Sequence, residues 1–117
     1  MGFKLGSEKR QIRNSQTTPI FRKKMEEGVL GEANKDGSIT INEKIKEGSK
    51  LEKEVIKHEQ KHIDDMQNPK IALNYTDKYV SYKGKKYPRK NGKIKYNGTW
   101  HEEGSKVFPW EKRAYNA

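Results

Sequence analysis

The chain has 117 residues, of which 30% are hydrophobic and 36% are charged, and it contains no cysteine. This length suits one domain with a modest core and is too short for two ordinary domains. The absence of cysteine excludes disulfides, a thiol nucleophile and thiolate zinc sites. Histidine and carboxylate side chains are therefore the only metal ligands to consider.

The formal net charge of +10 would draw the protein towards anionic partners such as nucleic acid, anionic lipid or an acidic cell-wall polymer. The lysines are spread along the chain, and the basic and aromatic residues at 79–97 match no named nucleic-acid-binding motif. We therefore expect a lysine-rich solvated surface, without nucleic acid as a partner. No apolar run has the length of a membrane span and no secretory signal is recognised, so no membrane partner is expected and the localisation stays undetermined.

The first part of the chain contains two predicted segments. Residues 1–17 show no sustained hydrophobic period and are interpreted as an extended arm. Thr18 and Pro19 resemble a helix cap and first turn, and Gly28 is a typical stop, so this pattern predicts a short helix at about 19–27.

A β-hairpin and a long helix are predicted next. Residues 29–33 and 38–42 flank a turn at 34–37, and the second segment alternates apolar and polar residues as a half-buried strand does. Ser49 and Glu52 then form an S-x-x-E capping box. Together with the stop at Asn68-Pro69, this box predicts a helix at about 50–67.

The last part of the chain predicts a small β-meander and a short helix. Tyrosine-rich runs between residues 75 and 105 are separated by the turn pairs Lys83-Gly84, Asn91-Gly92 and Asn97-Gly98. Pro109 opens the final helix, and Trp100, Phe108 and Trp110 are interpreted as core residues. The sequence thus predicts an α+β fold, with one domain at 18–117 that carries a β-rich insert at about 70–105.

The most informative motif is HEQKH, residues 58–62, on the predicted long helix. Histidines four residues apart project from the same helix face, within reach of one ion. In H-E-x-x-H zinc hydrolases two neutral imidazoles hold Zn²⁺, and the glutamate takes a proton from the water on the metal. The pattern therefore predicts a zinc site with His58 and His62 as ligands and Glu59 as general base. A metal-free, charged surface helix is the alternative.

A catalytic zinc site takes a third protein ligand and leaves a fourth position for water. The candidates are Glu111, His101, Asp64 and Asp65. The two aspartates follow His62 closely on the same helix and are better suited to orient an imidazole from behind. Glu111 fits better, although an exposed carboxylate paired with a neighbouring lysine or arginine is the alternative interpretation.

The order of these segments resembles the small zincin metallopeptidases of the gluzincin type. The matching segments are 31–42, 54–66 and 109–117, with the tyrosine-rich insert outside the match. The resemblance implies Zn²⁺ bound by His58, His62 and Glu111, with Glu59 as base. It also implies that the second hairpin strand borders the cleft and pairs with an extended substrate. That strand consists of Ser38, Ile39, Thr40, Ile41 and Asn42.

Two functions are consistent with these features. The first is a zinc-dependent peptidase or amidase acting on an extended peptide such as a peptidoglycan stem, with Tyr115 or His101 as hydrogen-bond donor to the developing oxyanion. The second is a structural or assembly protein of a bacteriophage particle, in which zinc stabilises a thin core and residues 1–17 bind other virion proteins. Virion association is expected in the second case.

Overall fold

The computed structural model describes residues 18–117, so the predicted arm at 1–17 lies outside the described residues. The chain divides into two compact units, one ending at Ile63 and the other running from Asp64 to Ala117. This boundary falls inside helix α1 (Lys50–Gln67), which therefore contributes residues to each unit. The single domain with an insert at about 70–105 stays a prediction.

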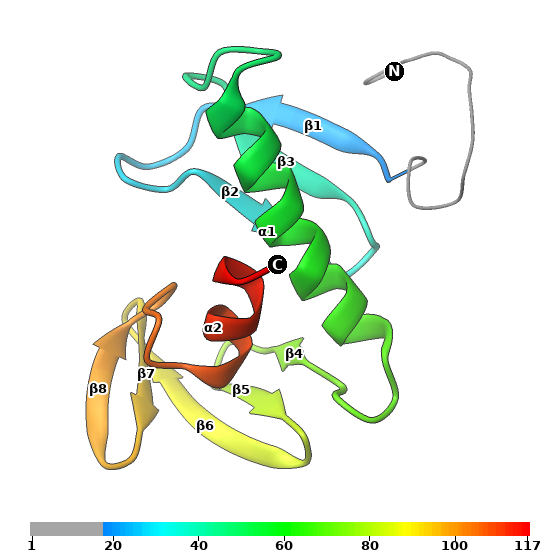
Figure 1. Cartoon of the computed structure of the whole chain (residues 1–117). Coiled ribbons are helices and arrows are strands. Elements are labelled where there is room, and N and C mark those ends of the chain that lie inside the picture. The colour runs from blue at the N-terminus through cyan, green and yellow to red at the C-terminus, as the bar shows by residue number, and fades with distance from the viewer. Residues whose placement is uncertain (1–17) are drawn as a thin grey trace. The chain divides into compact units, whose positions relative to one another are not determined.

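Within residues 18–117 the fold is α+β, as predicted, with two helices and two sheets (Figure 1). The first sheet consists of β1 (Ile20–Lys23), β2 (Gly31–Ala33) and β3 (Ile39–Asn42). The second consists of β4 (Asn74–Tyr75), β5 (Tyr79–Tyr82), β6 (Lys85–Lys90), β7 (Lys93–Tyr96) and β8 (Thr99–Glu102). Helix α2 (Pro109–Tyr115) follows. Neither α1 nor α2 combines the length and hydrophobicity that a membrane-crossing helix needs.

The three-stranded sheet of the first unit has the order β1-β3-β2. β2 and β3 form the predicted antiparallel hairpin, with Ala33 opposite Ile39. β1 pairs with β3 in parallel, with Ile20 also opposite Ile39. β3 is therefore the central strand, and all four of its residues are buried.

The predicted helix at 19–27 is wrong, because residues 20–23 form strand β1. Its side chains alternate between half-buried and exposed, as the two faces of a strand require. Thr18, Pro19 and Gly28 are local signals of a helix, whereas the main-chain pairing of β1 with β3 is a long-range contact. Such tertiary pairing overrides weak local propensity in a segment this short.

Helix α1 has the predicted bounds, and its capping box is formed. The backbone N–H of Glu52 donates to Ser49 Oγ at 3.1 Å, and Glu52 Oε1 accepts the N–H of Gly48 at 2.9 Å. The other carboxylate oxygen of Glu52 accepts a hydrogen bond from Arg22 Nη1 at 2.6 Å. One glutamate thus caps the helix and links it to β1. Apolar residues of the sheet, of the helix and of the connection between them form the core of this unit: Ile39, Ile41, Ile45, Val55 and Ile63.

Gly31 allows β2 to approach helix α1 closely. A Cβ atom at this position would lie 2.7 Å from Val55 Cγ1 and 3.1 Å from the carbonyl oxygen of Thr40. The same atom would lie 3.5 Å from Cγ of Glu59. Real Cβ atoms essentially never lie 2.7 Å from another carbon, so a larger residue here would force Val55 or the strand to shift. The observed packing of β2 on the helix therefore favours glycine at this position.

The five strands of the second unit form the predicted meander, in the order β4-β5-β6-β7-β8. Three of its connections are two-residue turns, at Lys83-Gly84, Asn91-Gly92 and Asn97-Gly98. All six of these residues have positive φ angles, between 50° and 84°. Type I′ hairpin turns require this conformation at both central positions, so the turn pairs recognised in the sequence are confirmed.

The core of the second unit combines aliphatic residues with the aromatic residues Tyr82, Phe108 and Trp110. The Phe108 and Trp110 rings stack with centroids 4.9 Å apart, and both side chains are fully buried, as predicted. Trp100, also expected in the core, is instead 41% exposed. It lies opposite Lys95 on β8, while its neighbour His101 lies opposite the buried Ile94. The strand alternation therefore directs Trp100 to the outer face of the sheet.

We predict that Gly31→Ala lowers the free energy of unfolding by about 1–3 kcal/mol, because the added methyl group overpacks the β2–α1 contact. Urea denaturation followed by circular dichroism measures this loss. Glu32→Ala on the exposed face of β2 is the matched control and should change stability by less than about 0.5 kcal/mol. Equal stability of the Gly31→Ala protein and the wild type would contradict the close approach.

Candidate metal centre

Helix α1 places the two histidines of the HEQKH motif on one face. The ring centroids of His58 and His62 are 4.8 Å apart, and the ring planes are nearly perpendicular at 82°. His62 is buried, with 3% of its surface exposed, and His58 is half-buried. The four-residue spacing on a regular helix is sufficient to bring the two rings this close together.

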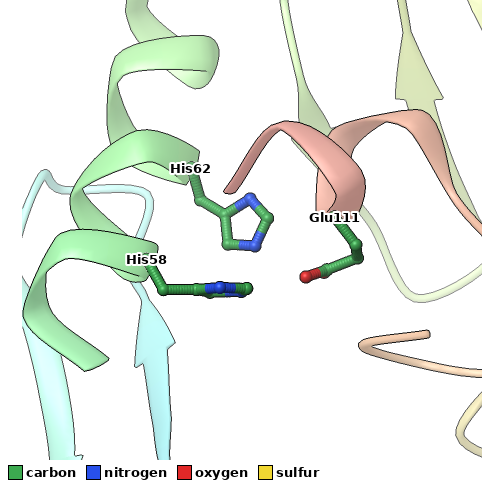
Figure 2. Close-up of side chains that lie close together, drawn as sticks. All are labelled: His58, His62 and Glu111. Carbon is green, nitrogen blue, oxygen red and sulfur yellow. The ribbon is translucent and has the colours of Figure 1, made fainter. Parts of the chain in front are cut away.

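Glu111 of α2 joins the two histidines. Each of the three residues offers one ligand atom, and these atoms all lie within 4.8 Å of one another. In Figure 2 both imidazoles and the Glu111 carboxylate point towards a common region. His58, His62 and Glu111 therefore form a group that could hold a metal ion.

The dimensions of this group can be compared with those of a zinc site. Ligand atoms about 2.0–2.1 Å from a tetrahedral ion lie about 3.3 Å from each other. The ligand atoms, which lie within 4.8 Å of one another, would therefore have to approach each other by up to about 1.5 Å to bind zinc. Rotation of the half-buried His58 side chain and of the long Glu111 side chain can provide this movement. The donor set is therefore compatible with a metal ion of this size once the side chains close around it.

Glu111 is held in place by its neighbours on α2. It follows Trp110, which is buried in the core of the second unit, and it is itself only 6% exposed. Pro109 occupies the first turn of the helix, where its missing N–H costs no hydrogen bond. The alternative of an exposed Glu111 on a solvated terminal helix is therefore wrong.

An ion pair that the sequence did not indicate links α2 to the last turns of α1, within the second unit. Arg113 donates from Nε and Nη2 to the two carboxylate oxygens of Asp65, both at 3.0 Å. Asp65 is 1% exposed. The hydrogen bond to Asp65 raises the pKa of Arg113 above its ordinary value, so the guanidinium stays charged. Asp65 was expected to support an imidazole, and the structure shows it binding the helix that carries Glu111.

The position of Asp65 offers a signal that could have been found in the sequence. His58, His62 and Asp65 stand at i, i+4 and i+7, which places all three along one stripe of α1. A buried carboxylate on such a stripe needs a cationic partner. The spacing of residues along the chain does not identify which of the 26 lysines and arginines is this partner.

Glu59, the predicted general base, is buried with 9% exposure. It follows His58 on α1, and its Cγ lies near Gly31 of strand β2. The buried setting suits a proton-transfer group, because bulk water competes less for its carboxylate.

The two predicted oxyanion donors lie in defined surroundings. The Tyr115 hydroxyl donates to the carbonyl oxygen of Gly104 at 3.1 Å, and the side chain is 48% exposed, with Lys106 Nζ 4.9 Å from the ring centroid. His101 was expected in a loop, but it lies in β8 with its ring edge-on to Phe108 at 5.9 Å. Catalytic roles for both residues stay predictions.

The predicted substrate strand requires a correction. Residues 39–42 form the central strand β3, whose two edges pair with β1 and β2. Main-chain pairing of residues 38–42 with an extended substrate is therefore wrong, because their hydrogen-bonding edges are already occupied. The edge strands of this sheet, within residues 18–63, are β1 and β2. Of these, β2 approaches Glu59 through Gly31.

Comparisons with protein-family models, curated proteins and solved structures find no match to this chain. The functional argument therefore depends on the motif and on side-chain geometry. The strongest part of that argument is local, since two candidate ligands and the predicted base lie within five consecutive residues of one helix.

We predict that Asp65→Asn weakens zinc affinity about 10- to 100-fold, because the neutral amide no longer forms the ion pair that holds α2, and with it Glu111. Titration against a chromophoric chelator measures the affinity. Lys112→Ala removes an exposed cation from the same helix and serves as the control. An Asp65→Asn protein that keeps its helical circular dichroism and binds zinc as the wild type does would contradict the positioning role.

Proposed function

We propose that this protein is a zinc-dependent hydrolase of peptide or amide bonds, with a site similar to that of the gluzincin metallopeptidases. The observation that carries the proposal is the group His58, His62 and Glu111, whose ligand atoms lie within 4.8 Å of one another. Glu59 lies next to the first histidine on the same helix. Two imidazoles and one glutamate form the donor set of a catalytic zinc site that leaves one position for water.

The choice of zinc follows from the donor types. Imidazole nitrogens favour zinc and other transition metals over magnesium and calcium, which prefer sites made only of oxygen ligands. A mixed set of two nitrogens and one carboxylate is common for zinc, and structural zinc sites more often contain cysteine, which this chain lacks. The donor set therefore supports an open, catalytic type of site.

The chain's own residues have distinct roles in the proposed reaction. When bound, Zn²⁺ lowers the pKa of a water ligand towards neutrality and polarises the substrate carbonyl. His58 and His62 would each bind the ion through one neutral ring nitrogen, and Glu111 would supply a negatively charged oxygen. The Glu59 carboxylate accepts the proton of the attacking water and then transfers it to the nitrogen of the leaving amine.

The proposed substrate is an extended peptide that adds to the edge of strand β2. β2 ends its sheet within the described residues, so its outer main-chain groups are available for pairing. Gly31 brings this strand close to Glu59, which would direct a paired peptide towards the general base. A peptidoglycan stem peptide is one substrate of this kind, since the positive charge of the chain favours an anionic cell wall.

The second candidate is a structural metal site in an assembly protein, such as a component of a bacteriophage particle. The small cores favour it: the two hydrophobic clusters contain five and seven buried residues. An ion bound by His58, His62 and Glu111 would add stability that such cores supply poorly. Binding of virion proteins through residues 1–17 belongs to this candidate.

We expect the metal-free protein to bind one Zn²⁺ and to unfold at a higher temperature once zinc is added, because the ion binds only the folded ligand set. Isothermal titration calorimetry and thermal denaturation measure the two effects. Glu111→Gln should lower the affinity at least tenfold, because the carboxylate charge is lost. His101→Ala, which removes the histidine outside the group, should leave binding unchanged. Equal losses in these two variants would contradict the ligand assignment.

We expect Glu59→Gln to keep zinc and to lower peptide cleavage about 10²- to 10⁴-fold, because the amide cannot accept the proton. Cleavage of a mixed peptide library and of peptidoglycan fragments, followed by mass spectrometry, measures the activity. Glu54→Gln, at an exposed glutamate of the same helix, should cleave normally. A wild-type protein that binds zinc and cleaves none of these substrates would favour the structural candidate.

A further inference from the structure

The outer face of the meander is strongly basic. Between residues 78 and 101 the sequence contains eight lysines and arginines and no aspartate or glutamate. Along β7, Ile94 is 2% exposed, whereas Lys93 and Lys95 on either side of it are exposed. Strand alternation therefore sends the apolar residues to the core and the lysines to the opposite face.

The strand register brings these lysines together. Lys90 of β6 lies opposite Lys93 of β7, so two like charges face each other across neighbouring strands. Directly opposite residues have Cβ atoms about 4.5–5.5 Å apart, and like charges at this distance destabilise a sheet. Lys86, on the same face of β6, lies opposite Ser81 of β5. The arrangement is unfavourable for the protein alone and favourable with an anion above it.

Two aromatic side chains lie beside the lysines. Trp100 on β8 is opposite Lys95 and remains 41% exposed, although tryptophan is the largest apolar side chain. Tyr79 on β5 is half-buried, and Lys86 Nζ lies 4.7 Å from its ring centroid. One acidic residue accompanies this face, Glu102, whose carboxylate is 3.7 Å from Lys93 Nζ and 77% exposed. We call this surface the basic sheet face: Tyr79, Lys86, Lys90, Lys93, Lys95 and Trp100.

We propose that the basic sheet face binds single-stranded nucleic acid. Its lysines neutralise backbone phosphates, and Trp100 and Tyr79 offer ring surfaces on which unpaired bases stack. Duplex bases are already stacked inside the helix and cannot reach these rings, so a single strand fits better. The strands β5 to β8 follow one another in an antiparallel sheet, so that residues of the basic sheet face lie on neighbouring strands (Figure 1).

This inference does not depend on the proposed hydrolase function. The basic sheet face belongs to strands β5–β8, whereas the metal ligands belong to α1 and α2. It also departs from the expectation of a solvated lysine surface without nucleic acid as a partner. In the sequence the lysines of residues 78–95 look scattered, and the alternation and register of the strands place four of them, Lys86, Lys90, Lys93 and Lys95, on one face.

Fluorescence anisotropy of a labelled oligothymidine about 15 nucleotides long tests the proposal with the full chain. Trp100→Ala should weaken binding about 5- to 100-fold, the range expected when one stacked base loses its aromatic partner. Replacement of Lys90, Lys93 and Lys95 together by alanine should reduce the slope of log affinity against log salt by about 2, since each phosphate contact on a single strand contributes about 0.7. Removal of zinc by a chelator should leave this binding unchanged.

A charge-matched control distinguishes binding at the basic sheet face from general electrostatic attraction of nucleic acid to the positively charged protein. Lys24, Lys35 and Lys53 are exposed lysines outside the meander, and their joint replacement by alanine should leave the salt slope within about 0.7 of the wild type. An equal loss in the two triple variants would overturn the proposal. Equal binding of oligothymidine by the Trp100→Ala protein and the wild type would also overturn it. So would a heparin affinity that exceeds the oligothymidine affinity and is the same in the Trp100→Ala protein and the wild type. Either result would indicate a general polyanion surface.

Discussion

The ion pair between Asp65 and Arg113 is the contact on which the candidate metal centre most depends. Both hydrogen bonds are 3.0 Å long, and Asp65 is almost fully buried. Loss of Arg113 would therefore leave the Asp65 carboxylate buried without this cationic partner, which is unfavourable. Asp65 lies three residues after His62 on a regular helix, and Arg113 lies two residues after Glu111 on another. A planar guanidinium bound through two nitrogens resists rotation as well as separation. This pair therefore restrains the helix that carries the candidate third ligand.

The two functional proposals use different kinds of chemistry on different elements of the chain. The candidate metal centre combines buried and half-buried side chains of few types, two histidines and two glutamates, in which the identity and position of each atom matter. The basic sheet face combines exposed lysines with two rings, in which total charge and surface matter more than any single atom. A small lysine-rich protein can support both, because the first requires core positions and the second requires only the outer side of a sheet.

The local elements of this fold could be predicted because their causes are local. The capping box at Ser49 and the turn pairs such as Asn91-Gly92 act over two to four residues, and both are formed as expected. The helix prediction for residues 20–23 was wrong for the opposite reason, because strand β1 depends on its pairing with β3, about twenty residues away. The same long-range pairing makes β3 a central strand, which no hairpin pattern could indicate.

The sequence by itself determined that His58, His62 and Glu59 share one helix, because helical geometry converts a spacing of four residues directly into proximity. It also indicated Glu111 as the best third ligand, on residue type and resemblance. Only the tertiary structure decided that Glu111 is buried near both imidazoles, that Arg113 binds Asp65, and that Lys90 and Lys93 share one face. These arrangements arise from contacts between segments distant in sequence, and chain spacing carries no information about which distant segments will meet.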